Sequence, residues 1–156
     1  MYLLDTNVVS ELRKAARADR HVVAWAASVP TGSLFLSVVT LLELEKGVLL
    51  VERRDPAQGA LLRAWLDHQV LPAFEHRILD LDPKIALRCA ALHIPNPRPD
   101  RDAMIAATAL EHGLTIVTHN GGNFAGCGAE IISPFDSRPS SFATMSGPAR
   151  QARMPA

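Results

Sequence analysis

The 156-residue chain is short of cysteine and of aromatic residues, and it has no excess of either charge. Its two cysteines, Cys89 and Cys127, are too few for a disulfide framework or a structural zinc set. The 16 lysines and arginines are balanced by 16 acids, which argues against the large basic surface of a dedicated nucleic-acid coat protein. Aromatic side chains make up 5% of the chain, so no stacking platform for RNA bases is evident.

Long hydrophobic runs are also missing. None approaches the roughly 18 residues that a membrane-spanning helix needs. Asp5 interrupts the apolar start of the chain, where a signal peptide would need an unbroken apolar core. We therefore expect a cytoplasmic protein without membrane association. The six histidines show no spacing typical of a metal-binding pair, which favours oxygen ligands for any bound ion.

The hydrophobic fraction of 48% is ample for one compact domain. Strands are predicted at 2–4, 34–37, 115–117 and 130–132, with a weaker fifth at 78–81. Helices are predicted near 7–17, 20–28, 38–54, 56–73, 83–93, 101–112 and 121–125. Strands that alternate with helices over long crossovers indicate an α/β/α sandwich with a central, mostly parallel sheet.

The composition changes from about Ser137 onward, where proline, serine and alanine accompany arginines and no acid occurs. Such a segment has too little apolar surface to order itself. We therefore predict one domain at residues 1–135 and a disordered C-terminal tail at 136–156.

Several helix ends carry recognisable capping signals. Asp55 and Asp82 each precede a proline, which predicts a capping acid followed by proline at the first helical position. Gly113 follows a helical stretch and is expected to adopt the left-handed conformation that ends a helix. Asp100 is interpreted as the N-cap of the helix at 101–112.

Three carboxylates lie at or beside predicted strand ends or helix starts. They are Asp5 after the first strand, Glu43 shortly after the second, and Asp102 at the start of a late helix. In an open α/β sheet, such positions converge on one crevice at the carboxyl ends of the strands. Carboxylates crowded into one crevice repel one another unless protons or a hard cation such as Mg²⁺ or Mn²⁺ enter. This pattern favours metal-assisted phosphodiester chemistry.

Each of these acids also has a purely structural explanation. Asp5 is suited to cap the first helix, and Asp102 lies in a first turn, where the helix dipole favours an acid. Glu43 stands three residues after Thr40, which makes a capping box if a helix begins there. Apolar neighbours surround Glu45 rather than Glu43, so periodicity alone would select Glu45 first. The residues taken singly leave these alternatives open.

Four segments resemble the conserved blocks of the PIN (PilT N-terminal) domain in VapC-type bacterial toxins, and they occur in the same order. The segments are YLLDTNVVSELRK at 2–14, LSVVTLLELEKG at 36–47, DAMIAATA at 102–109 and TIVTHN at 115–120. The first and third are the more specific, and the resemblance extends over residues 1 to about 135. It places Glu43, and not Glu45, at the acidic position of the second block.

The resemblance implies a metal-dependent endoribonuclease that serves as the toxin of a type II toxin–antitoxin pair. By position, Asp5, Glu43 and Asp102 would be the catalytic and metal-binding acids around Mg²⁺ or Mn²⁺. Residues that would orient these acids, contact a phosphate or act as weak ligands are Thr6, Asn7, Thr118, Asn120 and Asn123. The expected partners are an RNA substrate, a small antitoxin and a second copy of the chain in a homodimer.

Asn123 departs from the family pattern, because many relatives carry an acid there. An amide brings no charge, so a second metal ion would be held by fewer charges than the first. Two alternatives compete with the ribonuclease. A degenerate PIN domain would act only as a binding module, with Asn123 as its support. A haloacid-dehalogenase-like phosphatase would need an acid where the chain has Asn7.

For the ribonuclease, we expect the acids to form a rigid cage around the ion. Removing one charge from that cage should leave the metal-free fold as stable as before, or more stable.

Overall fold

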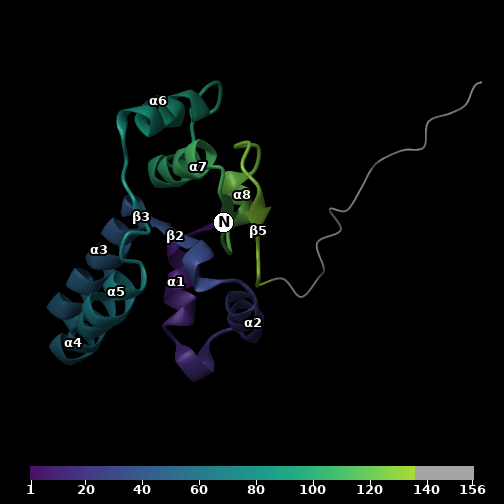
Figure 1. Ribbon diagram of the computed structural model, residues 1–156. Helices are drawn as coiled ribbons and strands as arrows, with labels where there is room; N and C mark the ends of the chain where they lie inside the picture. The colour runs from purple at the N-terminus through teal and green to yellow at the C-terminus, as the bar shows by residue number, and fades with distance from the viewer. Residues whose placement is uncertain (136–156) are drawn as a thin grey trace, which may run out of the picture.

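The structure is a computed structural model, and it describes residues 1–135 (Figure 1). The predicted tail at 136–156 lies outside the described residues. Five parallel strands form one sheet in the order β3-β2-β1-β4-β5. Their bounds are Tyr2–Leu4 for β1, Leu34–Ser37 for β2, Ile78–Leu79 for β3, Thr115–Val117 for β4 and Ile131–Ile132 for β5. The parallel sheet that the alternation predicts is confirmed.

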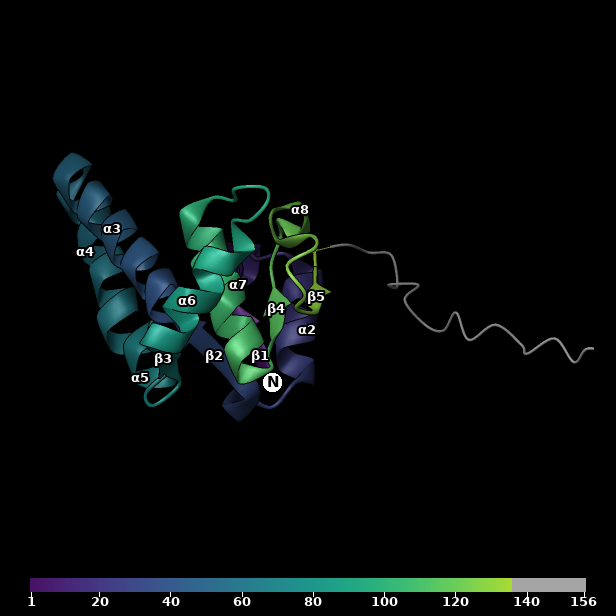
Figure 2. The same ribbon diagram turned by 90° about the horizontal axis from the view of Figure 1, so that it is seen from above.

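Helices cover the sheet on both sides. They are α1 Thr6–Leu12, α2 Arg20–Ser28, α3 Val38–Arg54, α4 Pro56–Trp65, α5 Leu71–Ala73, α6 Pro83–Leu92, α7 Asp100–His112 and α8 Gly121–Phe124. Figures 1 and 2 show α6 and α7 together as one layer, with α1 and α2 on the opposite side of the sheet. Helices α3, α4 and α5 extend away from the sheet as a separate group. No helix within residues 1–135 is long and apolar enough to cross a bilayer.

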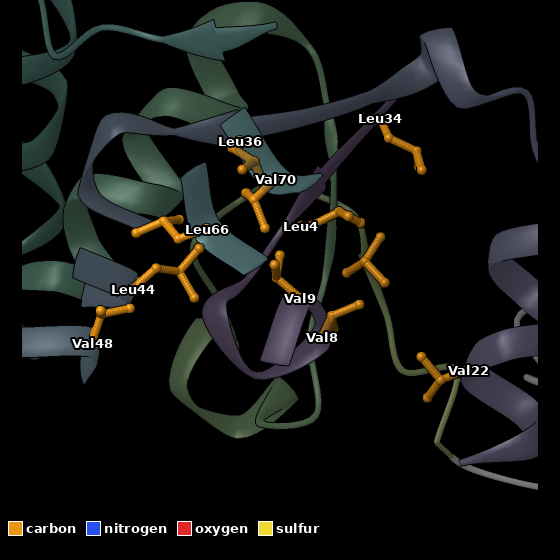
Figure 3. Close-up of a cluster of buried hydrophobic side chains, with 11 residues drawn as sticks. Leu4, Val8, Val9, Val22, Leu34, Leu36, Leu44, Val48, Leu66 and Val70 are labelled. Carbon is orange, nitrogen blue, oxygen red and sulfur yellow. The ribbon is translucent and has the colours of Figure 1, made fainter. Parts of the chain in front are cut away.

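Two apolar cores join these layers to the sheet, and a third packs α6 against α7. One core joins β1 and β2 to α1, α3 and the segment after α4, through residues such as Leu4, Val8 and Leu44 (Figure 3). The other core packs α7 and α8 against β1 and β4, through residues that include Ile105 and Phe124. Because apolar side chains on both faces of the sheet are covered, the strands are mainly hydrophobic, with Ser37 and Thr115 as the polar exceptions.

The sheet order creates a topological switch at its centre. From β1 the chain moves to β2 and β3 on one side, and then crosses to β4 and β5 on the other. The carboxyl ends of β1 and β4 are therefore neighbours, and the backbone N–H of Asp5 donates to the carbonyl of Val117 at 2.9 Å. A crevice at such a switch point is where open α/β sheets bind ligands.

Most of the predicted helix ends are confirmed. The Asp55 and Asp82 carboxylates cap α4 and α6 by accepting backbone N–H groups of Gln58 and Ile85. Gly113 ends α7 with φ of 63°. The prediction that Asp100 is the N-cap of α7 is wrong. Asp100 is the first residue of the helix, and its side chain caps no backbone N–H. Its carboxylate lies 3.7 Å from a ring nitrogen of His93 instead.

The helix predicted at 7–17 is shorter in the structure. α1 ends at Leu12, and Ala15 begins a 3₁₀ turn with φ of 51°. After this turn, the Glu11 carboxylate fixes the segment before α2 by accepting the backbone N–H of Asp19 at 2.8 Å. This tertiary contact overrides the good helix propensity of the alanines, which is why the sequence does not predict the break.

The helix predicted at 56–73 is present, but its hydrogen bonding changes part of the way along. A π-helical segment, Leu66–Val70, separates α4 from α5. Pro72 explains the change, because proline has no N–H and its ring clashes with the carbonyl four residues earlier. Leu66 and Val70 are both buried, so the segment still presents an apolar side to the core.

Helices α3 and α4 approach each other very closely. A Cβ added at Gly59 would lie 2.4 Å from the Cα of Glu52, so only glycine fits there. The Arg63 guanidinium then bridges the pair by donating to Glu45 at 2.7 Å and 2.9 Å and to Glu52 at 3.0 Å. The paired helices owe their geometry to this close contact.

Gly59→Ala should lower the free energy of unfolding by about 1–3 kcal/mol, because the added methyl group meets backbone that cannot move alone. Gly47→Ala, at a helical position of α3 with nothing within 4 Å, is the control. It should be neutral or should stabilise the protein by up to about 1 kcal/mol through helix propensity. Chemical denaturation of both variants checks this. Equal stability of the two variants would contradict the close approach.

A carboxylate cluster at the switch point

Asp5 is the first residue after β1, and its carboxylate is firmly held. Oδ1 accepts the backbone N–H of Thr6 at 2.8 Å, so Asp5 caps α1 as well. Oδ2 accepts the Thr118 hydroxyl at 2.7 Å and the Asn7 side-chain amide at 3.0 Å. The residue is only 7% exposed. The capping explanation is therefore correct, and it does not exclude a functional role.

Thr118 and Asn7 also bind each other and the loop after β4. The Asn7 amide donates to Thr118 Oγ1 at 3.3 Å, while its carbonyl accepts the His119 N–H at 3.0 Å. Thr118 Oγ1 accepts the backbone N–H of Asn120 at 3.0 Å. The Asn120 contribution to this network comes from its backbone. Together these groups orient the Asp5 carboxylate from behind, which is how ligand carboxylates are usually supported.

Glu43 lies on α3, and its side chain is 24% exposed beside Asp5. Burial raises the pKa of the Glu43 carboxyl, and the negative charge of Asp5 raises it further. Arg101 opposes this shift, with Nη1 at 3.8 Å from Oε2 of Glu43. The capping-box explanation of Glu43 is wrong, because α3 begins at Val38 and is capped by the Ser37 hydroxyl.

Glu45 points to a different neighbour, although it is only two residues away. Its carboxylate binds the Arg63 guanidinium in bidentate fashion, which lowers the Glu45 pKa and ties α3 to α4. Residues two apart on a helix differ by roughly 200° of rotation, so Glu43 and Glu45 cannot serve the same site.

Asp102 is the third member of the cluster and lies in the first turn of α7. Burial raises the pKa of the Asp102 carboxyl, and the charge of Asp5 adds to the shift. The Asn123 side-chain amide acts in the opposite direction and lowers this pKa. Asp102 in turn raises the pKa of Glu43. The three acids that the sequence singles out are therefore electrostatically coupled.

Thr6 provides an unusual polar group beside these acids. Its buried hydroxyl oxygen forms no hydrogen bond of normal geometry within the described residues. The hydroxyl is nevertheless close enough to Glu43 to lower that pKa. Buried hydroxyls are normally satisfied, so an unsatisfied one beside Glu43 indicates a place for water or an ion.

The donor set fits a hard, hydrated cation. Only oxygen donors come together here, and Mg²⁺ prefers oxygen ligands and retains several of its own waters. The acids do not form the closed cage that we expect from the sequence. Across residues 1–135, no three His, Cys, Asp or Glu side chains approach closely enough to hold an ion jointly. Water would therefore complete the coordination between carboxylates and ion.

Comparison with known proteins decides the family. A model of the PIN domain matches residues 2–127. The chain belongs to the PIN domain family. The VapC ribonuclease Y4jK of Sinorhizobium fredii is 35% identical over 87% of this chain and 99% of its own length. Toxin FitB of Neisseria gonorrhoeae is 34% identical over 86% of this chain and 99% of its own length.

Solved structures show the same PIN fold. The crystal structure of FitAcB from Neisseria gonorrhoeae has a TM-score of 0.79 and 33% identity, covering 86% of this chain and 99% of that chain. A toxin–antitoxin complex from Klebsiella pneumoniae has a TM-score of 0.64 and 25% identity, covering 87% and 99%. The resemblance of the four sequence blocks to the PIN domain is thereby confirmed.

One basic residue lies beside the acids of this PIN domain. The sequence offers Arg101, grouped with Arg98, only as one of several basic residues that could lie beside a metal site, and the structure places its guanidinium at Glu43. The available signal is its place between Asp100 and Asp102 at a helix start, where a cation is unfavourable for the helix dipole.

Asp102→Asn should change the pH dependence of stability. In the metal-free protein the raised pKa values of Glu43 and Asp102 mean that the folded state binds more protons than the unfolded state. Stability therefore falls as the pH rises from about 4, the ordinary carboxyl pKa, through the raised values. Asp102→Asn relieves part of this loss, so in EDTA it should be more stable than the unmodified protein near neutral pH. The difference should disappear near pH 4.

Denaturant titrations at several pH values check this, with the exposed Asp80→Asn as a control outside the cluster. Asp5→Asn should behave differently from Asp102→Asn, because it loses an acceptor that three donors share. A stability gain for Asp102→Asn that is the same at every pH would contradict the coupled cluster.

Proposed function

We propose that this protein is the toxin of a type II toxin–antitoxin system and cleaves RNA as a divalent-metal-dependent endoribonuclease. The observation that carries the proposal is the coupling of Asp5, Glu43 and Asp102 at the switch point of the sheet. The pKa values of Glu43 and Asp102 are raised, and keeping both carboxylates ionised beside Asp5 is costly unless a cation neutralises them. The names of the relatives, a VapC ribonuclease and a toxin, support RNA as the substrate.

Each acid has a part in this reaction. Asp5 and Asp102 are the proposed ligands of Mg²⁺ or Mn²⁺. Glu43 serves as a third ligand or orients the attacking water, and its raised pKa suits a group that accepts a proton. A bound divalent ion supplies a more acidic water and offsets charge on the phosphate and the leaving oxygen.

The support groups keep this arrangement in place. Thr118 and Asn7 fix the direction of the Asp5 carboxylate, and Thr6 offers a hydroxyl oxygen to water or the ion. Asn123 adds no charge beside Asp102, so a second ion would be held by fewer charges than the first. Both ends of the Asn7 amide are engaged in structural hydrogen bonds, which disfavours the phosphatase alternative.

The acid cluster is also a suitable target for inhibition. A carboxylate cluster with partly exposed members attracts an arginine, whose guanidinium pairs with carboxylates in bidentate fashion. We propose that a small antitoxin places an arginine there and packs an amphipathic segment along α1 and α3. Homodimerisation remains part of the proposal on family grounds.

Glu43→Gln should reduce RNA cleavage by about 100-fold or more, because it removes a charge and a proton acceptor from the cluster. Glu45→Gln is the matched control, since Glu45 contacts Arg63 and not the cluster. It should lose up to about 1 kcal/mol of stability and keep its activity. Cleavage of labelled RNA with added Mg²⁺ or Mn²⁺, and again in EDTA, measures this. Full activity of Glu43→Gln, or activity that survives EDTA, would refute the metal mechanism.

Co-expression with the neighbouring upstream reading frame tests the partner. A small protein should co-purify, suppress cleavage and relieve growth inhibition by the toxin. Changing the antitoxin arginine to alanine should restore cleavage while the complex persists, because the apolar contact along the helices remains. A complex in which the toxin stays fully active would show that the acid cluster is not the seat of inhibition.

A further inference from the structure

Arg101 is the cationic side chain beside the acid cluster. Within residues 1–135, its contact with Glu43 is the one ion pair that includes a member of the cluster. The separation of 3.8 Å is too long for a hydrogen bond, and the Arg101 side chain is 47% exposed. Its guanidinium therefore lies at the open side of the cluster and is only loosely held by Glu43.

Fold stability does not account for this arginine. Arg101 is the second residue of α7, where the positive end of the helix dipole disfavours a cation. Its neighbours Asp100 and Asp102 have the charge that suits this position. An exposed ion pair of such length contributes little to stability. The placement is therefore better explained by something that Arg101 binds.

RNA provides the matching chemistry. Every phosphate of an RNA strand is negative, and a site lined by three carboxylates repels the strand on either side of the reacting phosphate. A planar guanidinium offers paired N–H donors that match two phosphate oxygens. We propose that Arg101 binds a phosphate of the RNA strand beside the acid cluster and holds the strand in register for cleavage. The inference rests on the proposed ribonuclease function and assigns a substrate-binding residue to it.

Arg88 offers a closely matched control for Arg101. It lies on α6, its side chain is 46% exposed, and it pairs with Glu111 at 3.1 Å. Arg88→Gln therefore removes one positive charge from the ion pair with Glu111. This pair lies in the same layer of the fold but away from the cluster. Arg101→Lys keeps the charge and removes the planar donor pair.

RNA binding is measured by fluorescence anisotropy with a labelled single-stranded RNA oligonucleotide in MgCl₂, in an Asp102→Asn background that prevents cleavage and keeps the hydrogen bonds of Asp5 intact. Arg101→Gln should weaken binding by about tenfold, as expected for a lost charged hydrogen-bond pair. The slope of log affinity against log salt concentration should become shallower by about 0.7, the value for one contact to a single strand. Arg101→Lys should keep the slope with weaker binding, and Arg88→Gln should change neither.

Metal binding separates this role from simple damage to the site. Calorimetric titration of Mn²⁺ into the otherwise unmodified Arg101→Gln protein should show equal or tighter binding, because a neighbouring cation has been removed. In cleavage assays the same variant should raise KM more than it lowers kcat. Damage to the cluster would instead weaken Mn²⁺ and RNA binding together.

Unchanged RNA affinity and unchanged salt slope in Arg101→Gln would overturn the inference. So would loss of Mn²⁺ binding in that variant. In either case, metal-dependent cleavage by the unmodified protein would leave the proposed function standing. A protein that neither binds nor cleaves RNA in any form would overturn both.

Discussion

The functional site depends on the hydrogen bonds that hold the Asp5 carboxylate. Thr118 and Asn7 bind one oxygen of this buried group, and the N–H of Thr6 binds the other. Asp5 follows β1 and Thr118 follows β4. These bonds therefore join the ends of the two strands between which the strand order reverses. Burial raises the pKa values of Glu43 on α3 and Asp102 on α7, and the charge fixed at Asp5 raises both further.

The acid cluster that would bind a metal ion also lowers the stability of the metal-free protein. Burial and mutual repulsion destabilise the ionised acids in the metal-free protein, and a divalent cation removes that penalty when it binds. The cost is offset elsewhere in the fold, by two apolar cores and by the close packing of α3 on α4. The ion pairs differ between the α3–α4 contact and the acid cluster. Arg63 satisfies Glu45 and Glu52 in full, whereas Arg101 satisfies Glu43 only in part.

The parallel sheet and most helix bounds could be predicted from strand–helix alternation and capping acids, because those signals are local. The early end of α1 could not, since it depends on the contact between Glu11 and the backbone of Asp19. Likewise, periodicity alone would select Glu45 before Glu43, and the family resemblance was needed to choose Glu43. The structure shows the physical difference, which is the partner that each carboxylate meets. The sequence could name Arg101 only among several candidate basic residues, because the contact that distinguishes it joins α7 to α3.

The most direct test of this account is the free energy of unfolding as a function of Mg²⁺ concentration near neutral pH. A folded-state site stabilises the protein by about 1.4 kcal/mol for each tenfold increase in Mg²⁺ above its dissociation constant. We predict this dependence for the unmodified protein and for Glu45→Gln, and its loss in a variant with both Glu43→Gln and Asp102→Asn. Stability that does not respond to Mg²⁺ in the unmodified protein would contradict the claim that a divalent cation binds at the acid cluster.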